Sequence, residues 1–252
     1  MTRVVFLGGK EVGFFCLNHL LTHGKQLGIE VIGVLTSNKS ISGIAFSFQN
    51  LCEEYSVPML NNLNDLVDVS DVDILISVQY HLILSQEHIA KVNQIAINLH
   101  MAPLPEYRGC NQFSFAILDG VSEFGTTIHK LEESIDGGDL IAERRFKVVP
   151  NIFVKDLYDI ALKESKLLFI QNIKAIIDDE ITLIPQIDLP QERARGFHLR
   201  NEMEAIKQID ASWPVEQQKR HFRATYFPPF PPPVLVKGSE EIELDMNWYN
   251  SV

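Results

Sequence analysis

Three side chains that could take part in one reaction lie in the middle of the sequence. Asn98 and His100 stand two residues apart at the end of an apolar run, and Asp136 follows in a glycine-flanked loop. In a strand, residues two apart point to the same side. An imidazole can take a proton from an attacking amine near neutral pH, and an amide N–H can stabilise a developing oxyanion. Asp136 would orient His100, stabilise its positive charge or relay a proton through water.

This set includes no nucleophilic serine or cysteine, so it fits acyl transfer in which the acceptor itself attacks. A second interpretation is structural, with His100 as a core histidine beside an aspartate of a turn. Other chemistries have less support. The sequence has no G-x-S-x-G motif, and His81 and His88 lack the helical spacing and the supporting carboxylate of a metal site, so we expect no bound metal.

The glycine turn at Gly8 and Gly9 stands where a nucleotide-binding loop would, between the first expected strand and the first expected helix. A Walker loop needs Ser or Thr after its lysine, where Glu11 stands, and a dinucleotide fingerprint needs glycine at the position of Lys10. The sequence is therefore that of an ordinary tight turn, or of a turn that directs backbone amides and Lys10 at an anion.

The elements that must position these residues follow from the hydrophobic pattern. Short β-branched runs alternate with longer amphipathic stretches, which is typical of βαβ units that build a parallel sheet. The strand-like runs are residues 3–7, 29–35, 73–78, 94–99, 125–131 and 140–149. The helix-like stretches are residues 11–23, 42–55, 85–92, 110–118 and about 154–177. We therefore predict a doubly wound, mostly parallel α/β sheet of Rossmann-like form over residues 1–180, with Asn98 and His100 pointing into the crevice where such sheets bind ligands.

The composition changes after residue 180. Residues 227–233 read Phe-Pro-Pro-Phe-Pro-Pro-Pro, and two strand-like runs follow at 234–237 and 241–244. We therefore predict a second, smaller region, residues 181–252, with a Pro-rich segment and a β-hairpin. The Pro-rich segment would be a rigid crossing with Phe227 and Phe230 packed on the core, or a polyproline ligand for an SH3-type partner.

The length, charge and cysteine content of the chain exclude several classes of protein. The chain has 252 residues, of which 46% are hydrophobic, and a formal charge of −11 from 22 Lys+Arg and 33 Asp+Glu. A chain of this length can bury a core that needs no metal or disulfide, and its acidic balance argues against a nucleic-acid partner. Its three cysteines include no CxxC pair, its first apolar run is too short for a signal peptide, and no run reaches the length of a membrane span. We therefore expect a cytoplasmic protein with no membrane association.

The order of the motifs resembles the folate-dependent formyltransferases. The residues that carry the resemblance are Asn98-x-His100, Pro103-Leu104-Pro105, Tyr107-Arg108-Gly109, Gly125-x-Thr127 and Ile135-Asp136-x-Gly138-Asp139. The resemblance implies N10-formyltetrahydrofolate as formyl donor, an amine as acceptor, and Asn98, His100 and Asp136 as catalytic residues. It also implies pterin contacts, mainly from backbone, in two loops that contain Gln79, Leu82, Ile83, Leu84, Ile135 and Asp139.

Within that family, residues 104–111 and 223–231 look similar to the nucleotide-sugar N-formyltransferases. This similarity implies an acceptor that is a 3- or 4-amino-dideoxy hexose linked to dTDP or GDP, used in surface polysaccharide such as O-antigen. The implied acceptor contacts are Lys10, Tyr80 and His81 with the phosphates or sugar, and Tyr107 and Asn111 with the hexose. His81 stands where many members carry a stronger cation, which makes it a weaker phosphate partner. In that group the C-terminal hairpin commonly forms a dimer contact, so we expect a homodimer through the C-terminal region.

Two alternatives remain open. One is a methionyl-tRNA formyltransferase-like enzyme, although those enzymes carry a longer C-terminal barrel and a basic surface that the region after residue 180 and the charge of −11 do not match. Glycinamide ribonucleotide transformylases fit less well, because they end near the long helix and their phosphate loop differs from Gly8-Gly9-Lys10. The other alternative is a non-catalytic binding module with a Pro-rich tail.

Overall fold

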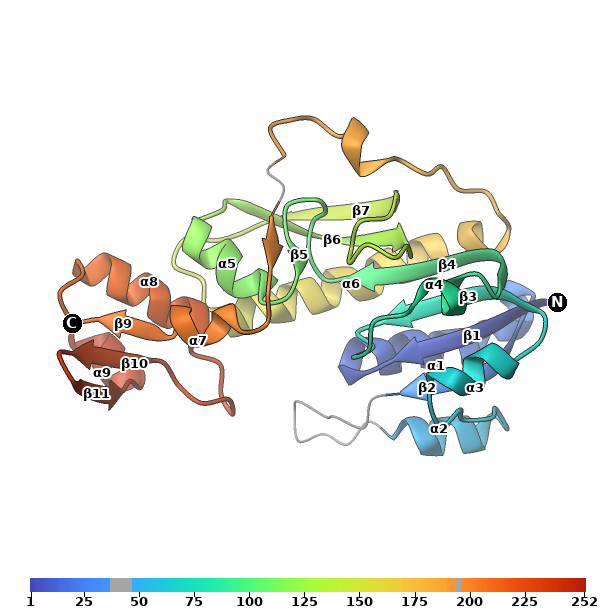
Figure 1. Cartoon of the computed structure of the whole chain (residues 1–252), viewed down its shortest axis with the longest axis horizontal. Coiled ribbons are helices and arrows are strands. Elements are labelled where there is room, and N and C mark those ends of the chain that lie inside the picture. The colour runs from blue at the N-terminus through green and yellow to red at the C-terminus, as the bar shows by residue number, and fades with distance from the viewer. Residues whose placement is uncertain (37–46, 194–195) are drawn as a thin grey trace.

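The computed structural model describes residues 1–36, 47–193 and 196–252. Its largest element is a six-stranded sheet with the strand order β2-β1-β3-β4-β6-β7 (Figure 1). The strands are β1 (Thr2–Gly8), β2 (Ile29–Thr36), β3 (Val72–Val78), β4 (Val92–His100), β6 (Glu123–Lys130) and β7 (Leu140–Lys147). The mostly parallel α/β architecture predicted from the sequence is confirmed.

The sheet has a parallel half and an antiparallel half. Strands β2, β1, β3 and β4 pair in parallel, whereas β6 pairs antiparallel with both β4 and β7. The parallel strands are buried on both faces, because Val4 and Phe6 of β1 point into one core cluster and Val5 and Leu7 into another. Burial on both faces explains why β1 is a continuous apolar run in the sequence.

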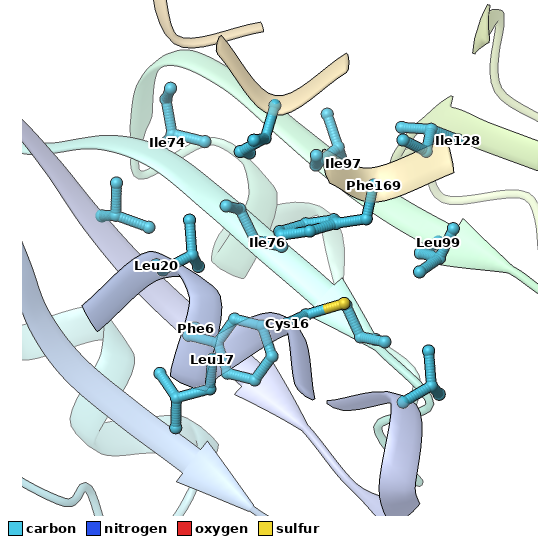
Figure 2. Packing of buried hydrophobic residues seen from close by; sticks show 14 of the residues in the cluster. Phe6, Cys16, Leu17, Leu20, Ile74, Ile76, Ile97, Leu99, Ile128 and Phe169 are labelled. Atoms are coloured by element: carbon cyan, nitrogen blue, oxygen red, sulfur yellow. The ribbon is translucent and has the colours of Figure 1, made fainter. Parts of the chain in front are cut away.

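Helices cover the sheet. They are α1 (Lys10–Leu27), α2 (Phe48–Glu54), α3 (Leu63–Asp68), α4 (Gln86–Ile89), α5 (Gln112–Asp119) and α6 (Val154–Ile177). Figure 2 shows the core beneath α1 and α6, where Leu17 and Leu20 of α1 and Phe169 of α6 pack over Ile76 and Ile97 of the sheet. Burying each of these side chains contributes about 1.5–3 kcal/mol. Among the described residues, no helix combines the length and the apolar character needed to cross a bilayer.

Some helix ends differ from the predictions. Helix α1 continues to Leu27 because Gly28 takes the left-handed conformation, φ 75°, that closes it. The helix predicted over 85–92 begins after Ser85 as expected but ends at Ile89, since Val92 already pairs with Val72 of β3. Of the helix predicted over 42–55, residues 48–54 form α2, and residues 42–46 lie outside the described residues.

The segment after α6 returns to the sheet. It contains the 3-10 turn η1 (Gln186–Asp188), β8 (Phe197–His198) and α7 (Glu202–Ile206). Ile184 forms a bridge with the start of β7, and β8 pairs in parallel with the two-residue strand β5 (Arg108–Gly109) that follows β4. Figure 1 shows this segment in orange, running back past β7 to β5. No pattern in the sequence indicated this return.

A small sheet ends the chain. The predicted hairpin forms from β10 (Val234–Lys237) and β11 (Glu240–Glu243), and β9 (Gln208–Asp210) adds a parallel strand beside β10. Helices α8 (Val215–Thr225) and α9 (Met246–Ser251) pack on it through Phe222, Ile209 and Leu244.

The Pro-rich segment lies partly on the core. Phe227 is half-buried, with its ring 5.6 Å from that of Tyr158 on α6, and Phe230 packs on Phe227 at 5.7 Å while remaining 45% exposed. Phe227 therefore packs as predicted, and Phe230 covers it from the solvent side.

Candidate active site

The candidate site lies at the carboxyl ends of the parallel strands. Strand β2 lies on one side of β1, whereas β3 and β4 lie on its other side. The strand order therefore reverses between β1 and β3, and open α/β sheets bind ligands at such a reversal. The turn after β1 joins the end of β3 there, since the Gly9 amide donates to the Val78 carbonyl at 3.0 Å. Lys10 comes shortly after β1, Gln79 directly follows β3, and His100 is the last residue of β4. The sheet therefore brings these residues, which are far apart in sequence, to the same edge.

His100 ends β4 and is held from two sides. Its Nε2–H donates to the Tyr107 carbonyl at 2.7 Å, and its own carbonyl accepts a hydrogen bond from Thr126 of β6 at 2.9 Å. The side chain is buried. Because the Tyr107 carbonyl can only accept, Nε2 keeps its proton and Nδ1 is the ring atom that can gain or lose one.

Asp136 faces that nitrogen. Its Oδ1 lies 3.6 Å from His100 Nδ1, and its Oδ2 accepts the Gly109 amide at 2.8 Å. Burial alone raises the pKa of this carboxyl, but His100, His129 and the Gly109 amide outweigh burial and hold its pKa well below the usual range. Asp136 is therefore ionised at neutral pH, and it can stabilise a protonated His100.

His129 completes the cluster, and the sequence analysis did not identify it. It lies on β6 directly across from Asn98 in the antiparallel register. Its Nδ1 lies 2.9 Å from the Lys130 carbonyl oxygen, and its Nε2 lies 3.1 Å from Asn98 Nδ2 and 3.5 Å from Asp136 Oδ1. One sequence feature could have identified His129. It lies two residues after Thr127 in a strand expected to be buried, and a buried polar side chain needs a hydrogen-bond partner.

The loop that carries Asp136 is fixed by residues distant in sequence. Arg108 donates through Nε and Nη2 to the Ile135 carbonyl at 2.9 and 2.6 Å. Gln186, from the returning segment, donates to the carbonyls of Asp136 and Gly138, each at 2.8 Å. The Asp139 carbonyl accepts from the Lys130 amide. These hydrogen bonds hold the loop that carries Asp136 against β5, β6 and the segment after α6.

Tyr107 differs from its predicted role. Its side chain is buried against Phe124, and its hydroxyl donates to Asp119 at 2.8 Å. Burial and the Asp119 carboxylate raise the pKa of this phenol. The predicted hexose contact of its side chain is therefore corrected: Tyr107 acts on the site through its carbonyl, which orients His100.

A second group of predicted residues gathers around Lys10. Lys10 Nζ donates to Gln79 Oε1 at 2.8 Å, and Asn111 Nδ2 donates to the Leu199 and Arg200 carbonyls at 2.8 and 3.3 Å. Burial lowers the pKa of Lys10 and the nearby charge of Arg200 lowers it further, while Cys110 opposes these effects. Among the described residues, no carboxylate forms an ion pair with the half-buried Lys10 or the exposed Arg200, although the two cations are close enough for the charge of Arg200 to act on Lys10.

Four of the predicted residues share an uncommon backbone conformation. Lys10, Gln79, Asn111 and Asp136 have φ values of 59°, 53°, 59° and 49°. This left-handed region costs energy for residues other than glycine, and such residues concentrate where a site requires them. Ser56, Asp71, Asn151 and Asp179, which lie outside the candidate site, share this conformation, so it does not by itself mark a functional residue.

The loop after β3 supplies apolar side chains. Leu82 and Ile83 are 46% and 69% exposed, and Ile135 of the Asp136 loop is 38% exposed. Leu84 is buried in the core instead, so only its backbone could meet a ligand. The rings of Tyr80 and His81 contact each other at 4.9 Å, with Tyr80 half-buried and His81 exposed.

A model of the formyl transferase family matches residues 2–173. The GDP-perosamine N-formyltransferase of Brucella melitensis is 28% identical over 248 residues, which cover 93% of this chain and 88% of that protein. A methionyl-tRNA formyltransferase of Lactobacillus acidophilus is 26% identical over 199 residues, which cover 74% of this chain and 62% of that protein.

The fold is shared with solved structures. An N-formyltransferase of Helicobacter canadensis, determined with folinic acid and dTDP-3-aminofucose, superposes with a TM-score of 0.75 at 19% identity, covering 90% of this chain and 81% of that one. At this identity the likeness concerns the fold.

Proposed function

Because the chain belongs to the formyl transferase family, we propose that it moves a formyl group from N10-formyltetrahydrofolate to the amine of a nucleotide-linked amino-dideoxy sugar. The observation that carries the proposal is the largely buried Asp136 carboxylate, 13% exposed and 3.6 Å from His100 Nδ1, beside Asn98. This arrangement can remove a proton from an amine without a covalent enzyme intermediate.

His100 acts as the base. The amine nitrogen of the acceptor forms a bond to the formyl carbon and loses a proton, which His100 accepts at Nδ1. Nε2–H stays with the Tyr107 carbonyl throughout, so the ring does not turn. Asp136 stabilises the imidazolium in a buried setting where the attraction is stronger than in water. The proton then leaves Nδ1 for the donor nitrogen, whose bond to the formyl carbon breaks.

Asn98 stabilises the negative charge that develops on the formyl oxygen. One N–H of its amide bonds His129 Nε2 at 3.1 Å, and the second N–H is directed by that bond. We assign this second N–H to the oxyanion that develops on the formyl oxygen. His129 therefore acts as a positioning residue through Asn98 and Asp136.

The donor site fits the exposed apolar residues at the edge of the sheet. Bound N10-formyltetrahydrofolate supplies the electrophilic formyl carbon. Leu82, Ile83 and Ile135 offer apolar surface to its flat rings, and the backbone of Gln79, Leu84 and Asp139 lies within the same two loops. Exposed large apolar side chains grouped beside a polar cluster are typical of a ligand site.

The acceptor phosphates are assigned to Lys10 and Arg200. The charges of the two cations repel each other and no carboxylate of the described residues pairs with either, so a bound anion such as a diphosphate would stabilise both. Asn111 Nδ2 donates to the Arg200 carbonyl, and we assign its Oδ1 to a hydrogen bond from the hexose. Tyr80 and His81 remain assigned to the sugar or phosphate.

The acceptor class is supported by the relative that formylates GDP-perosamine, which aligns along 88% of its length. Only 62% of the methionyl-tRNA formyltransferase aligns. The formal charge of −11 also favours a small anionic sugar nucleotide, held by a local pair of cations, over a polynucleotide. No observation favours a non-catalytic module.

The cellular setting is part of the same proposal. A formylated nucleotide sugar made in the cytoplasm would be a precursor of surface polysaccharide such as O-antigen. A homodimer would form through the C-terminal region, where β11 is an edge strand that exposes Ile242. Edge strands with free backbone groups are common pairing surfaces.

The test is an activity assay with a panel of acceptors. Purified protein is mixed with N10-formyltetrahydrofolate and with dTDP- or GDP-linked 3-amino or 4-amino dideoxy sugars, and tetrahydrofolate release and the formylated sugar are measured. We expect turnover with one class of acceptor. If no sugar is formylated while initiator methionyl-tRNA is, the acceptor assignment is wrong; if none is formylated, the proposed function fails.

A further inference from the structure

A cavity of about 160 Å³ lies away from the candidate active site. It is enclosed by the end of α5, the loop between β7 and α6, and helix α8, which runs beside α5 (Figure 1). Most of its lining residues are apolar in type, and its polar lining includes Asn151, Arg220 and Arg223. None of the residues assigned to formyl transfer lines it.

Arg223 is the unusual member of this lining. The residue is 6% exposed, and its Nε has no hydrogen-bond partner in the described part of the chain. Nη1 donates to the Tyr249 hydroxyl at 3.1 Å, so α9 fixes the guanidinium in place. A buried charged donor without a partner costs more than a neutral one, and native proteins rarely retain it without a ligand or water.

Arg220 adds a second cation on the same face. Arg220 and Arg223 are three residues apart on α8 and therefore neighbours. Arg220 is exposed and makes one long contact, 3.4 Å, to the Leu118 carbonyl at the end of α5. No Asp or Glu lines the cavity, and among the described residues no carboxylate pairs with either arginine. Two neighbouring guanidinium groups repel each other unless an anion lies between them.

We propose that this cavity binds a small organic oxyanion, with its charged end on Arg223 and Arg220 and a short apolar body against the cavity wall. The wall residues that would contact the body include Ile117, Val121, Val149 and Ile152. A dry cavity of about 150 Å³ can hold a molecule of benzene size, so the ligand is far smaller than a nucleotide sugar. The charged group is a carboxylate or a phosphate, since both accept from paired guanidinium N–H groups.

The test measures binding with matched probes at constant ionic strength. Isovalerate supplies a carboxylate with a branched apolar body, isovaleramide is its neutral counterpart, and inorganic phosphate supplies the other anion. We expect one or both anions to raise the Tm with concentration, because a ligand that binds only the folded state stabilises it. Isovaleramide should have no such effect. A response to isovalerate identifies a carboxylate ligand, and a response to phosphate alone identifies a phosphate ligand.

Variants locate the effect. Arg223→Gln should weaken binding at least about tenfold, as expected for a lost charged hydrogen bond, and Arg220→Gln should weaken it less. Val149→Phe fills the cavity from an exposed position and should abolish binding even if Arg223→Gln does not fold. Lys237→Gln, which removes an equal charge from the exposed hairpin, and Lys10→Met should leave binding unchanged.

Three outcomes would overturn the proposal. They are no Tm rise with either anion, an equal rise with the neutral amide, or a rise that survives Val149→Phe but is lost in Lys10→Met. This last result would place the anion at the sugar-nucleotide site. Because binding is measured without turnover, the outcome does not depend on whether the formyl transfer assay succeeds.

Discussion

The amide of Asn98 and the imidazole of His129 face each other across the junction of the parallel and antiparallel halves of the sheet, with Nδ2 3.1 Å from Nε2. Asn98 lies two residues before the end of β4, on the same face as His100, and the antiparallel register brings His129 opposite it. His129 Nε2 also lies 3.5 Å from Asp136. His129 therefore connects Asn98, the expected oxyanion donor, with Asp136, the carboxylate beside the expected base His100.

Removing the imidazole of His100 should abolish turnover. His100→Ala removes the ring nitrogen assigned to accept the amine proton, so we expect kcat/KM to fall by about 10²–10⁴. The measurement is tetrahydrofolate release with the best acceptor from the panel, alongside a thermal melt. His88→Ala, on helix α4, is the control: it removes only hydrogen bonds to Ser85 at the start of that helix and should retain activity. Near-normal turnover in folded His100→Ala would disprove its role as base.

His129 should affect kcat more than KM. His129→Leu leaves Asn98 and Asp136 without their shared partner, so we expect kcat to fall about 10–100-fold, within the range for loss of an oriented oxyanion donor. His129→Gln, which can still accept from Asn98, should recover part of the loss. Equal kcat in both variants, with only Tm changed, would mean that His129 has a purely structural role.

Asp136 should link stability to pH in a defined direction. Its pKa is depressed in the folded protein, so its stabilising effect is complete above the ordinary value of 3.8 and is lost as pH falls through the folded pKa. Asp136→Asn should therefore have a lower Tm than wild type at about pH 7, and the difference should shrink below 3.8. Thermal melts across that range measure it. A Tm difference that stays constant with pH would contradict the assigned charge interactions.

Lys10 and Arg200 should control the acceptor KM. Lys10→Met and Arg200→Gln each remove a cation from the expected diphosphate, so we expect the acceptor KM to rise about tenfold, while the donor KM changes little. Lys25→Met, at the exposed far end of the same helix, is the matched control. If acceptor KM is unchanged in both variants, the phosphates bind elsewhere.

Gly109 should tolerate no side chain. Its φ is 86°, and a Cβ there would lie 2.3 Å from the His198 carbonyl. Its amide also donates to Asp136, so Gly109→Ala should lower both Tm and kcat. Gly120→Ala is the matched control, because Gly120 has φ 67° and no atom within 4 Å of the added Cβ. It isolates the backbone strain, about 1–2 kcal/mol, from the steric clash. Equal effects of the two substitutions would contradict the close approach of β8.

The sequence by itself determined the parallel part of the sheet. Strands β1 and β3 are continuous apolar runs because both faces are buried, and α6 occupies the predicted residues 154–177 because its apolar period is sustained. The pairing of Asn98 with His100 on one face followed from alternation alone. The residues that end strands at the carboxyl edge were therefore predictable.

Only the tertiary structure decided which distant groups complete the site. His129 depends on an antiparallel register, Gln186 and Arg200 on a segment that returns after α6, and Tyr107 on a core that takes its side chain and leaves its carbonyl for His100. None of these contacts is local in sequence. These contacts depend on how whole strands and helices pack against one another. A change of one residue in strand register, for example, would turn a side chain to the opposite face of the sheet.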